Sequence, residues 1–228
     1  MKTKSSLDRQ VYEVGIYCSY ITAICYMIVC VLALFSPKPI ATYIASKQYF
    51  VDFHNYKYYF IGLKCLLALA NATLVGVFLS IYHLKSEEKG GWLLFFSILA
   101  MIGAGIGMFQ SVLDATQIPH LASEYEVSSP EIKHIIIAFG VADPAIYALS
   151  LGLPGIWFFF VSWLYRKRFP MILILLTFLW GLGSILTIIA HLFAIVPILY
   201  LVALGALITT PLWAICQTKF LKQELSDY

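Results

Sequence analysis

Six long apolar runs divide this chain of 228 residues. A helix needs about 20 apolar residues to cross the roughly 30 Å hydrocarbon layer of a membrane, and each run is long enough. Because backbone inside lipid must satisfy its own hydrogen bonds, runs of this length predict helices. The sequence therefore predicts an all-α membrane protein, a single domain over residues 1–228 that forms a bundle of six transmembrane helices. The spans are expected at about 12–36, 58–83, 91–115, 143–165, 169–193 and 195–216.

The composition agrees with a chain dissolved in lipid. Hydrophobic residues make up 61% of the sequence and charged residues 12%, whereas a soluble domain has about 25% charged residues. The net charge of +3 is small and the basic residues are scattered, so the chain lacks the basic patch of a nucleic-acid-binding protein. The predicted partner is the lipid bilayer, and nucleic acid is excluded.

The basic residues also predict an orientation. If the amino terminus lies inside the cell, ten of the fifteen lysines and arginines fall in cytoplasmic segments. Cytoplasmic loops of membrane proteins carry an excess of these residues. The basic turn Arg166–Arg168 contributes most to the asymmetry. Both termini are therefore predicted to be cytoplasmic.

Prolines mark several expected helix starts. Ser129–Pro130 and Asp143–Pro144 each combine a capping residue with proline at the first helical position. They predict a short helix at about 130–142, lying at the outer surface, that leads into the fourth span. Pro154 falls in the middle of that span and predicts a kinked fourth helix. The outer segment 37–57 is expected to fold over the surface as a loop.

The third predicted span carries small and polar residues on one stripe. Gly103, Gly107, Gln110 and Asp114 are spaced by four, three and four residues, which places them on the same helical face. The GxxxG formed by Gly103 and Gly107 lets another helix approach closely. We favour helix packing for this stripe over the wall of a ligand site.

The second predicted span has a similar stripe at Lys64, Ala68 and Asn71. Lys64 lies about 9 Å inside the outer border, at 1.5 Å per residue. Its ammonium can snorkel to the surface, pair with Asp114 at a similar depth, or serve a function. Charged groups inside a membrane are often functional, so all three interpretations stay open.

Intramembrane polar residues gather in the outer half, and the half toward the cytoplasm is expected to be comparatively dry, apart from Glu13 at the start of the first span. Asp143 suits a helix cap better than a catalytic acid because proline follows it, and His191 is a lone histidine without the partners of a metal site. No metal, cofactor or catalytic residue is assigned. The hypothesis is an outward-facing polar pocket among the second to fifth spans, formed by Lys64, Asn71, Gln110, Asp114, Asp143 and His191.

The order of several weak motifs is similar to a known family. An early arginine and a series of glycine, proline and aromatic residues stand at Arg9, Gly15–Tyr17, Leu153–Trp157, Phe169–Pro170, Gly181 and Gly183. This pattern resembles a bacterial family of small multi-pass membrane proteins, the domain of unknown function numbered 4386. Members often have histidine early in the fourth span, where this chain has Asp143 nearby, so no functional residue is carried over. The resemblance implies a six-helix protein of the bacterial inner (plasma) membrane without an assigned activity.

Three functions remain open from the sequence. The first is binding or passage of a small or lipid-like ligand through the outward-facing pocket. The second is an accessory or structural subunit, whose glycine stripes pack against a membrane-protein partner or a second copy. The third is an intramembrane lipid-modifying enzyme, which predicts that Asp114, Asp143 and His191 converge. The chain has no GxSxG or HExxH motif, and we favour the first function, binding or passage of a ligand, over the other two.

Overall fold

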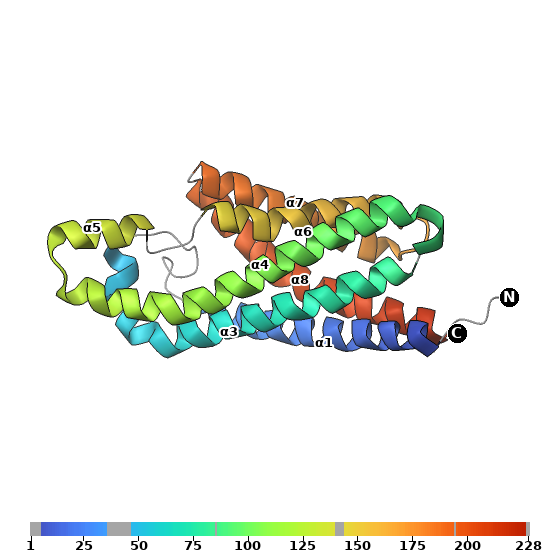
Figure 1. Cartoon of the computed structure of the whole chain (residues 1–228), viewed down its shortest axis with the longest axis horizontal. Helices are drawn as coiled ribbons and strands as arrows, with labels where there is room; N and C mark the ends of the chain where they lie inside the picture. Colours follow the sequence, from blue (N-terminus) through green and yellow to red (C-terminus); the bar gives the residue numbers. More distant parts are fainter. Residues whose placement is uncertain (1–5, 36–46, 85, 140–143, 194, 227–228) are drawn as a thin grey trace.

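The computed structural model describes residues 6–35, 47–84, 86–139, 144–193 and 195–226. All regular structure in these residues is α-helical, which confirms the all-α prediction (Figure 1). The helices are α1 (Ser6–Leu34), α3 (Lys47–His83), α4 (Ser86–Val127), α5 (Pro130–Phe139), α6 (Pro144–Leu164), α7 (Met171–Leu192) and α8 (Val196–Ser226).

The six long helices form a closed ring. Each packs chiefly against two neighbours, in the cyclic order α1, α3, α4, α6, α7, α8 and back to α1. The start of α1 and the end of α8 lie at the same end of the ring, which we call the terminal end (Figure 1). The opposite end carries α5, and we call it the lobe end.

The outward faces of the helices suit a lipid environment. In α1, for example, Val14, Tyr17, Ile24 and Val31 are exposed at helical spacing. Such a wide apolar surface is typical of a helix in contact with lipid rather than water. The fold is therefore that of an all-α membrane protein. Four described stretches are long and apolar enough to cross a membrane, and Ala148–Leu164 is a shorter apolar one; the four are Arg9–Leu34, Phe53–His83, Gly90–Val127 and Met171–Ala190.

Two helices are much longer than a membrane requires. At 1.5 Å per residue, the 37 residues of α3 and the 42 residues of α4 extend about 55 Å and 63 Å. The predicted loop at 37–57 is therefore wrong for residues 47–57, which belong to α3, while 37–46 lie outside the described residues. Likewise α4 continues past the expected border at residue 115 to Val127.

A separate apolar cluster explains why these extensions are helical. We define the lobe as α3 before residue 58, α4 after residue 115, and α5. Phe50, Phe53 and Tyr125 are buried in it, and Phe50 is stacked on Tyr125 at 5.0 Å between ring centroids. Helical periodicity therefore continues because both extensions bury one face against the other. The buried lobe residues and their neighbour are Phe50, Phe53, Phe60, Ile118, Ala122, Tyr125 and Ile136.

The predicted helix starts agree with the structure where it can be compared. Helix α5 begins at Pro130, and the Ile132 amide lies 3.5 Å from the Ser129 hydroxyl, in the position of a capping bond. Helix α6 begins at Pro144. The predicted end of the short helix at 142 and the predicted cap Asp143 lie outside the described residues.

Gly103 of α4 lies directly against the proline of α6. A β-carbon at Gly103 would stand 2.5 Å from Cδ of Pro154, whereas one at Gly105 would meet nothing within 4 Å. We expect Gly103→Ala to lower the free energy of unfolding by about 1–3 kcal/mol through overpacking. Gly105→Ala is the matched control, and we expect it to be neutral or to stabilise the helix by about 0.5–1 kcal/mol. Equal thermal unfolding midpoints of the two variants in detergent would contradict this packing.

Candidate functional site

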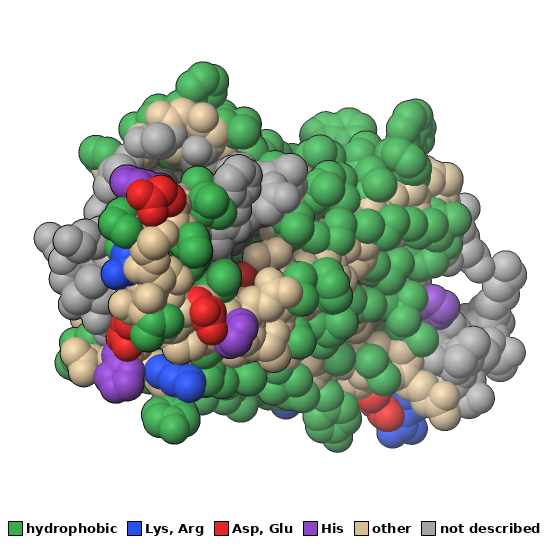
Figure 2. Space-filling view, turned by 60° about the vertical axis from the view of Figure 1, so that its left-hand side comes forward, with side chains coloured by type: hydrophobic (Ala, Val, Ile, Leu, Met, Phe, Trp, Pro, Cys, Tyr) green, Lys and Arg blue, Asp and Glu red, His purple; other side chains and the backbone are tan. Residues whose placement is uncertain are grey.

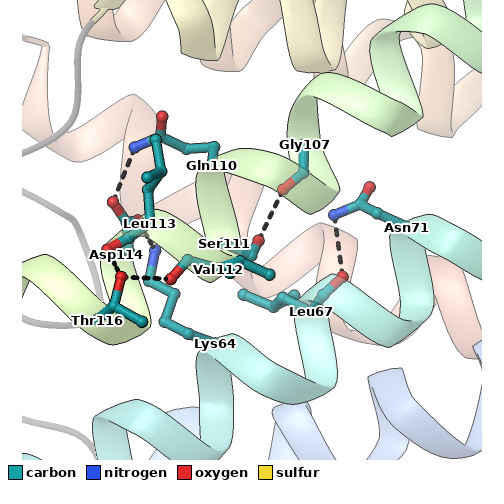
Figure 3. A network of polar contacts seen from close by, with 10 residues as sticks. All are labelled: Lys64, Leu67, Asn71, Gly107, Gln110, Ser111, Val112, Leu113, Asp114 and Thr116. Atoms are coloured by element: carbon teal, nitrogen blue, oxygen red, sulfur yellow. Dashed lines mark hydrogen bonds and ion pairs between the residues drawn. The ribbon is translucent and has the colours of Figure 1, made fainter.

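A buried ion pair joins α3 to α4. The Lys64 ammonium donates to Oδ2 of Asp114, and the two side chains are only 3% and 8% exposed. Figure 3 shows Lys64 reaching across from α3 to the carboxylate. This contact is the pairing that the sequence had left as one of three interpretations. Snorkelling to the surface does not describe the lysine, because its side chain is enclosed.

The carboxylate of Asp114 is bonded on both sides. Gln110, one turn earlier on α4, donates from Nε2 to Oδ1 of Asp114 at 2.7 Å. The Lys64 ammonium also lies 5.4 Å from the centroid of the Phe60 ring, in cation–π geometry. Removing two opposite charges from solvent is unfavourable unless each keeps good partners. Gln110 is half-buried, so it forms the solvent-accessible edge of this group.

Asn71 and Gly107 belong to the contact between α3 and α4 rather than to the ion pair. Asn71 donates to the carbonyl of Leu67 at 3.0 Å. A β-carbon at Gly107 would stand 3.1 Å from the Asn71 amide, and the Ser111 hydroxyl donates to the Gly107 carbonyl (Figure 3). Gly103 and Gly107 thus face two different neighbours, α6 and α3.

The other two residues of the predicted pocket are not placed. Asp143 lies outside the described residues, and His191 belongs to α7 but its side chain is not described. The structure therefore brings together Lys64, Gln110 and Asp114, with Asn71 two turns from Lys64 along α3. In the described part of the chain, no three histidine, cysteine or acidic side chains form a group that could hold a metal ion.

The ring is packed unevenly along its length. In α8 no described residue before Thr210 is buried, and in α6 none before Pro154 is. Beyond these positions, toward the terminal end, buried residues follow at nearly every turn. Figure 2 brings the lobe end forward and shows a hollow in the molecule with an acidic side chain deep inside it. Along α6 and α8 the described side chains are thus less enclosed in the lobe half of the ring, which we call the open half.

A buried aromatic cluster fills the inside of the ring on the terminal side of this open half. It consists of Phe78, Trp157, Phe158, Trp180 and Trp213, drawn from α3, α6, α7 and α8. Ring centroids are 4.1 Å apart between Phe158 and Trp180 and 4.6 Å apart between Trp180 and Trp213. The sequence analysis missed this cluster, because aromatic residues in membrane proteins are also expected at the interfaces.

Two of the three indole groups in this cluster, those of Trp157 and Trp213, donate to hydroxyl groups. Trp157 Nε1 donates to the Ser97 hydroxyl at 3.1 Å. Trp213 Nε1 donates to the Thr177 hydroxyl at 3.1 Å. A buried indole N–H needs such an acceptor, so these bonds fix the orientation of the two rings.

The expectation of a dry half toward the chain termini is wrong. Buried hydroxyl and amide side chains occur throughout it. The described residues buried in this half include no charged one. Several hydroxyls donate to the carbonyl one turn earlier, as Ser19 does to Gly15 at 2.8 Å. Such residues resemble ordinary small packing residues in a sequence. The set includes Ser19, Ser80, Ser97, Thr177, Gln217 and Thr218.

A second ion pair ties three segments together at the terminal end. Arg168, between α6 and α7, donates from Nε to Oε1 of Glu224 at 3.0 Å and from Nη2 to Oε2. Its Nη1 also donates to the carbonyl of Leu84 at 3.0 Å. The hydrogen bond to Glu224 raises the pKa of the Arg168 guanidinium above its usual value, although burial lowers it. From the sequence, Arg168 served only as evidence for the orientation of the chain in the membrane, and its pairing with Glu224 was not predicted.

Comparisons of this chain with protein-family models, with curated proteins and with solved structures found no match. The site must therefore be interpreted from its own chemistry.

Proposed function

We propose that the chain is a single six-span domain with both termini in the cytoplasm. Helices α6 and α8 complete the closed ring with the four stretches that are long and apolar enough to span. The start of α1, the end of α8 and the basic turn Arg166–Arg168 share the terminal end, which supports a cytoplasmic position for it. In this placement α5 lies at the outer interface and Pro154 kinks the fourth span.

The placement sets the depth of the Lys64–Asp114 pair. From His83, a layer of about 30 Å takes up about 20 residues of α3 and ends near Lys64. The pair then lies at the outer border of the hydrocarbon layer, beneath the lobe. By its resemblance to the bacterial family numbered 4386, we assign the protein to a bacterial plasma membrane and to that family as part of the same proposal.

We further propose that the open half of the ring binds a small or lipid-like ligand with a polar head group. The observation that carries this function is the buried Lys64–Asp114 pair, with Gln110 at its accessible edge. A head group with a negative charge can exchange for Asp114 on the ammonium, and apolar walls of the ring can hold the remainder. Ligand pockets combine an apolar lining with a few placed polar groups in this manner.

This function is tested with short-chain phospholipids as probes. Dihexanoyl phosphatidylglycerol and dihexanoyl phosphatidylcholine are titrated into delipidated protein in maltoside detergent, and the thermal unfolding midpoint is measured. We expect at least one probe to raise the midpoint by several degrees, because a ligand that binds only the folded state stabilises it. The double variant Lys64→Leu/Asp114→Leu should lose this response.

The control removes one cation and one anion from the other end of the ring. Arg9 and Glu13 form an exposed pair at 3.0 Å near the terminal end. Arg9→Leu/Glu13→Leu has the same charge change and should keep the full response. A folded Lys64→Leu/Asp114→Leu protein that still responds like the wild type would rule out this site. Absence of any response in the wild type would rule out a phospholipid-like ligand.

A further inference from the structure

Helix α8 carries a polar side chain at every seventh residue of one face. Thr210, Gln217 and Glu224 follow one another at this spacing, which places them on one stripe about 10 Å apart. Thr210 and Gln217 are both fully buried. Glu224 lies at the terminal end, where Arg168 holds it. The stripe therefore runs from the terminal end to the level at which the open half of the ring begins.

The stripe faces the inside of the ring. Trp213 lies between Thr210 and Gln217, and its ring is 5.2 Å from that of Phe158 on α6. Phe220 lies between Gln217 and Glu224, and its ring is 4.8 Å from that of Phe169. Polar groups and aromatic rings thus alternate along the buried face of α8.

The two buried polar groups have no partner in the described part of the protein. Neither amide atom of Gln217, nor the hydroxyl of Thr210, is hydrogen-bonded there. Buried hydroxyls on helices usually donate to a carbonyl of their own helix, as the Thr218 hydroxyl does to the Ala214 carbonyl at 2.8 Å. An amide buried without a partner is unfavourable, and leucine would fill the position at lower cost. A glutamine here points to a group that binds it.

We infer that Gln217 is a second binding position, inside the ring and on the cytoplasmic side of Trp213. Its amide offers an NH2 donor and a carbonyl acceptor. The buried face of α8 carries no charged side chain between Thr210 and Glu224. It therefore takes an uncharged hydrogen-bonding group, such as a hydroxyl or a carboxamide. Thr210, Gln217 and Glu224 then mark a route through the ring, with Trp213 and Phe220 as the barriers between them.

This inference rests on the proposed function, because it makes the open half of the ring the entrance to a passage. The Arg168–Glu224 pair closes the other mouth. It joins the end of α8 to the turns after α3 and α6, so these elements must separate before the route can open to the cytoplasm. Breaking the pair should expose Gln217 more often.

Thiol labelling tests the route without knowledge of the natural ligand. The probe is 2-hydroxyethyl methanethiosulfonate, which is small, uncharged and a hydrogen-bonding alcohol. Gln217→Cys is made in a chain whose five native cysteines are replaced by alanine. The control is Leu173→Cys, because Leu173 is equally buried in the apolar core of the same half. We expect the thiol at position 217 to react at least tenfold faster than that at 173.

Two further variants extend this test. Glu224→Ala breaks the Arg168–Glu224 contact, and Thr210→Cys is a substitution that should disturb the fold little. Glu224→Ala should increase the labelling rate at position 217 severalfold and leave the rate at 173 unchanged. Thr210→Cys, which is close to the native side chain in size, should also react faster than the control. Equal rates at 210, 217 and 173, with and without Glu224→Ala, in protein that remains monodisperse would overturn the route. That result would leave the phospholipid response intact. A wild-type protein that does not respond to phospholipid, or a folded Lys64→Leu/Asp114→Leu protein that still responds, would instead reject only the function proposed for the Lys64–Asp114 pair.

Discussion

Replacing Asp114 alone by leucine is expected to lower the free energy of unfolding by about 3–5 kcal/mol. The change leaves the Lys64 ammonium enclosed between α3 and α4 with its counter-charge gone. Removing one partner of a buried ion pair typically costs this much, because the remaining charge is neither solvated nor paired. Lys64→Leu should also destabilise the protein, and by somewhat less, since Gln110 still donates to the carboxylate.

The double variant Lys64→Leu/Asp114→Leu should recover most of the loss. A buried ion pair replaced by apolar side chains of similar size is often neutral or even stabilising. The free energies of unfolding are measured for all four proteins in mixed micelles titrated with dodecyl sulfate, and a double-mutant cycle isolates the coupling between the two residues. Additive effects of the single changes would show that the two charges do not depend on each other.

Trp213→Ala should be comparably severe, at about 3–5 kcal/mol. The indole is fully buried and contacts aromatic rings of α6 and α7, so its removal leaves a cavity where three helices meet. Lipid cannot fill that cavity, and in a membrane the packing of side chains is the main attraction between helices. The same titration measures the loss.

Two further variants separate packing from hydrogen bonding. Trp213→Phe keeps an aromatic ring and loses the bond to Thr177, so we expect it to cost about 1 kcal/mol beyond the change in ring size. Trp92→Ala removes an indole that is 68% exposed, and its effect should be much smaller. If Trp92→Ala were as harmful as Trp213→Ala, the central aromatic cluster would not be the main source of stability.

The sequence predicted the helical class and the middle of each long helix, because an apolar run of span length has few alternatives. It failed at the ends of α3 and α4. A hydropathy pattern reports where lipid ends, whereas a helix continues as long as one of its faces is buried. Phe50 and Tyr125 provide that burial outside the apolar runs, and residues so far apart in sequence cannot be paired by spacing alone.

The candidate site was only partly accessible to sequence reasoning. Lys64 and Asp114 could be matched because charges in apolar runs are rare and both stood at a similar depth. Gln217 was overlooked, although it lies midway between Thr210 and Glu224. The spacing of seven was visible in the sequence, but its meaning depends on burial: an amide signals a binding position only once neighbouring groups are seen to leave it without a partner.

The cyclic order of the helices has a consequence for how the protein is made. Since α8 is synthesised after the other five long helices of the ring and packs between α1 and α7, those five helices must stay in the membrane as an open arc until α8 follows. A chain that stops before residue 196 would present two unmatched helix faces to quality-control proteases. Closure of the ring therefore depends on α8 reaching α1.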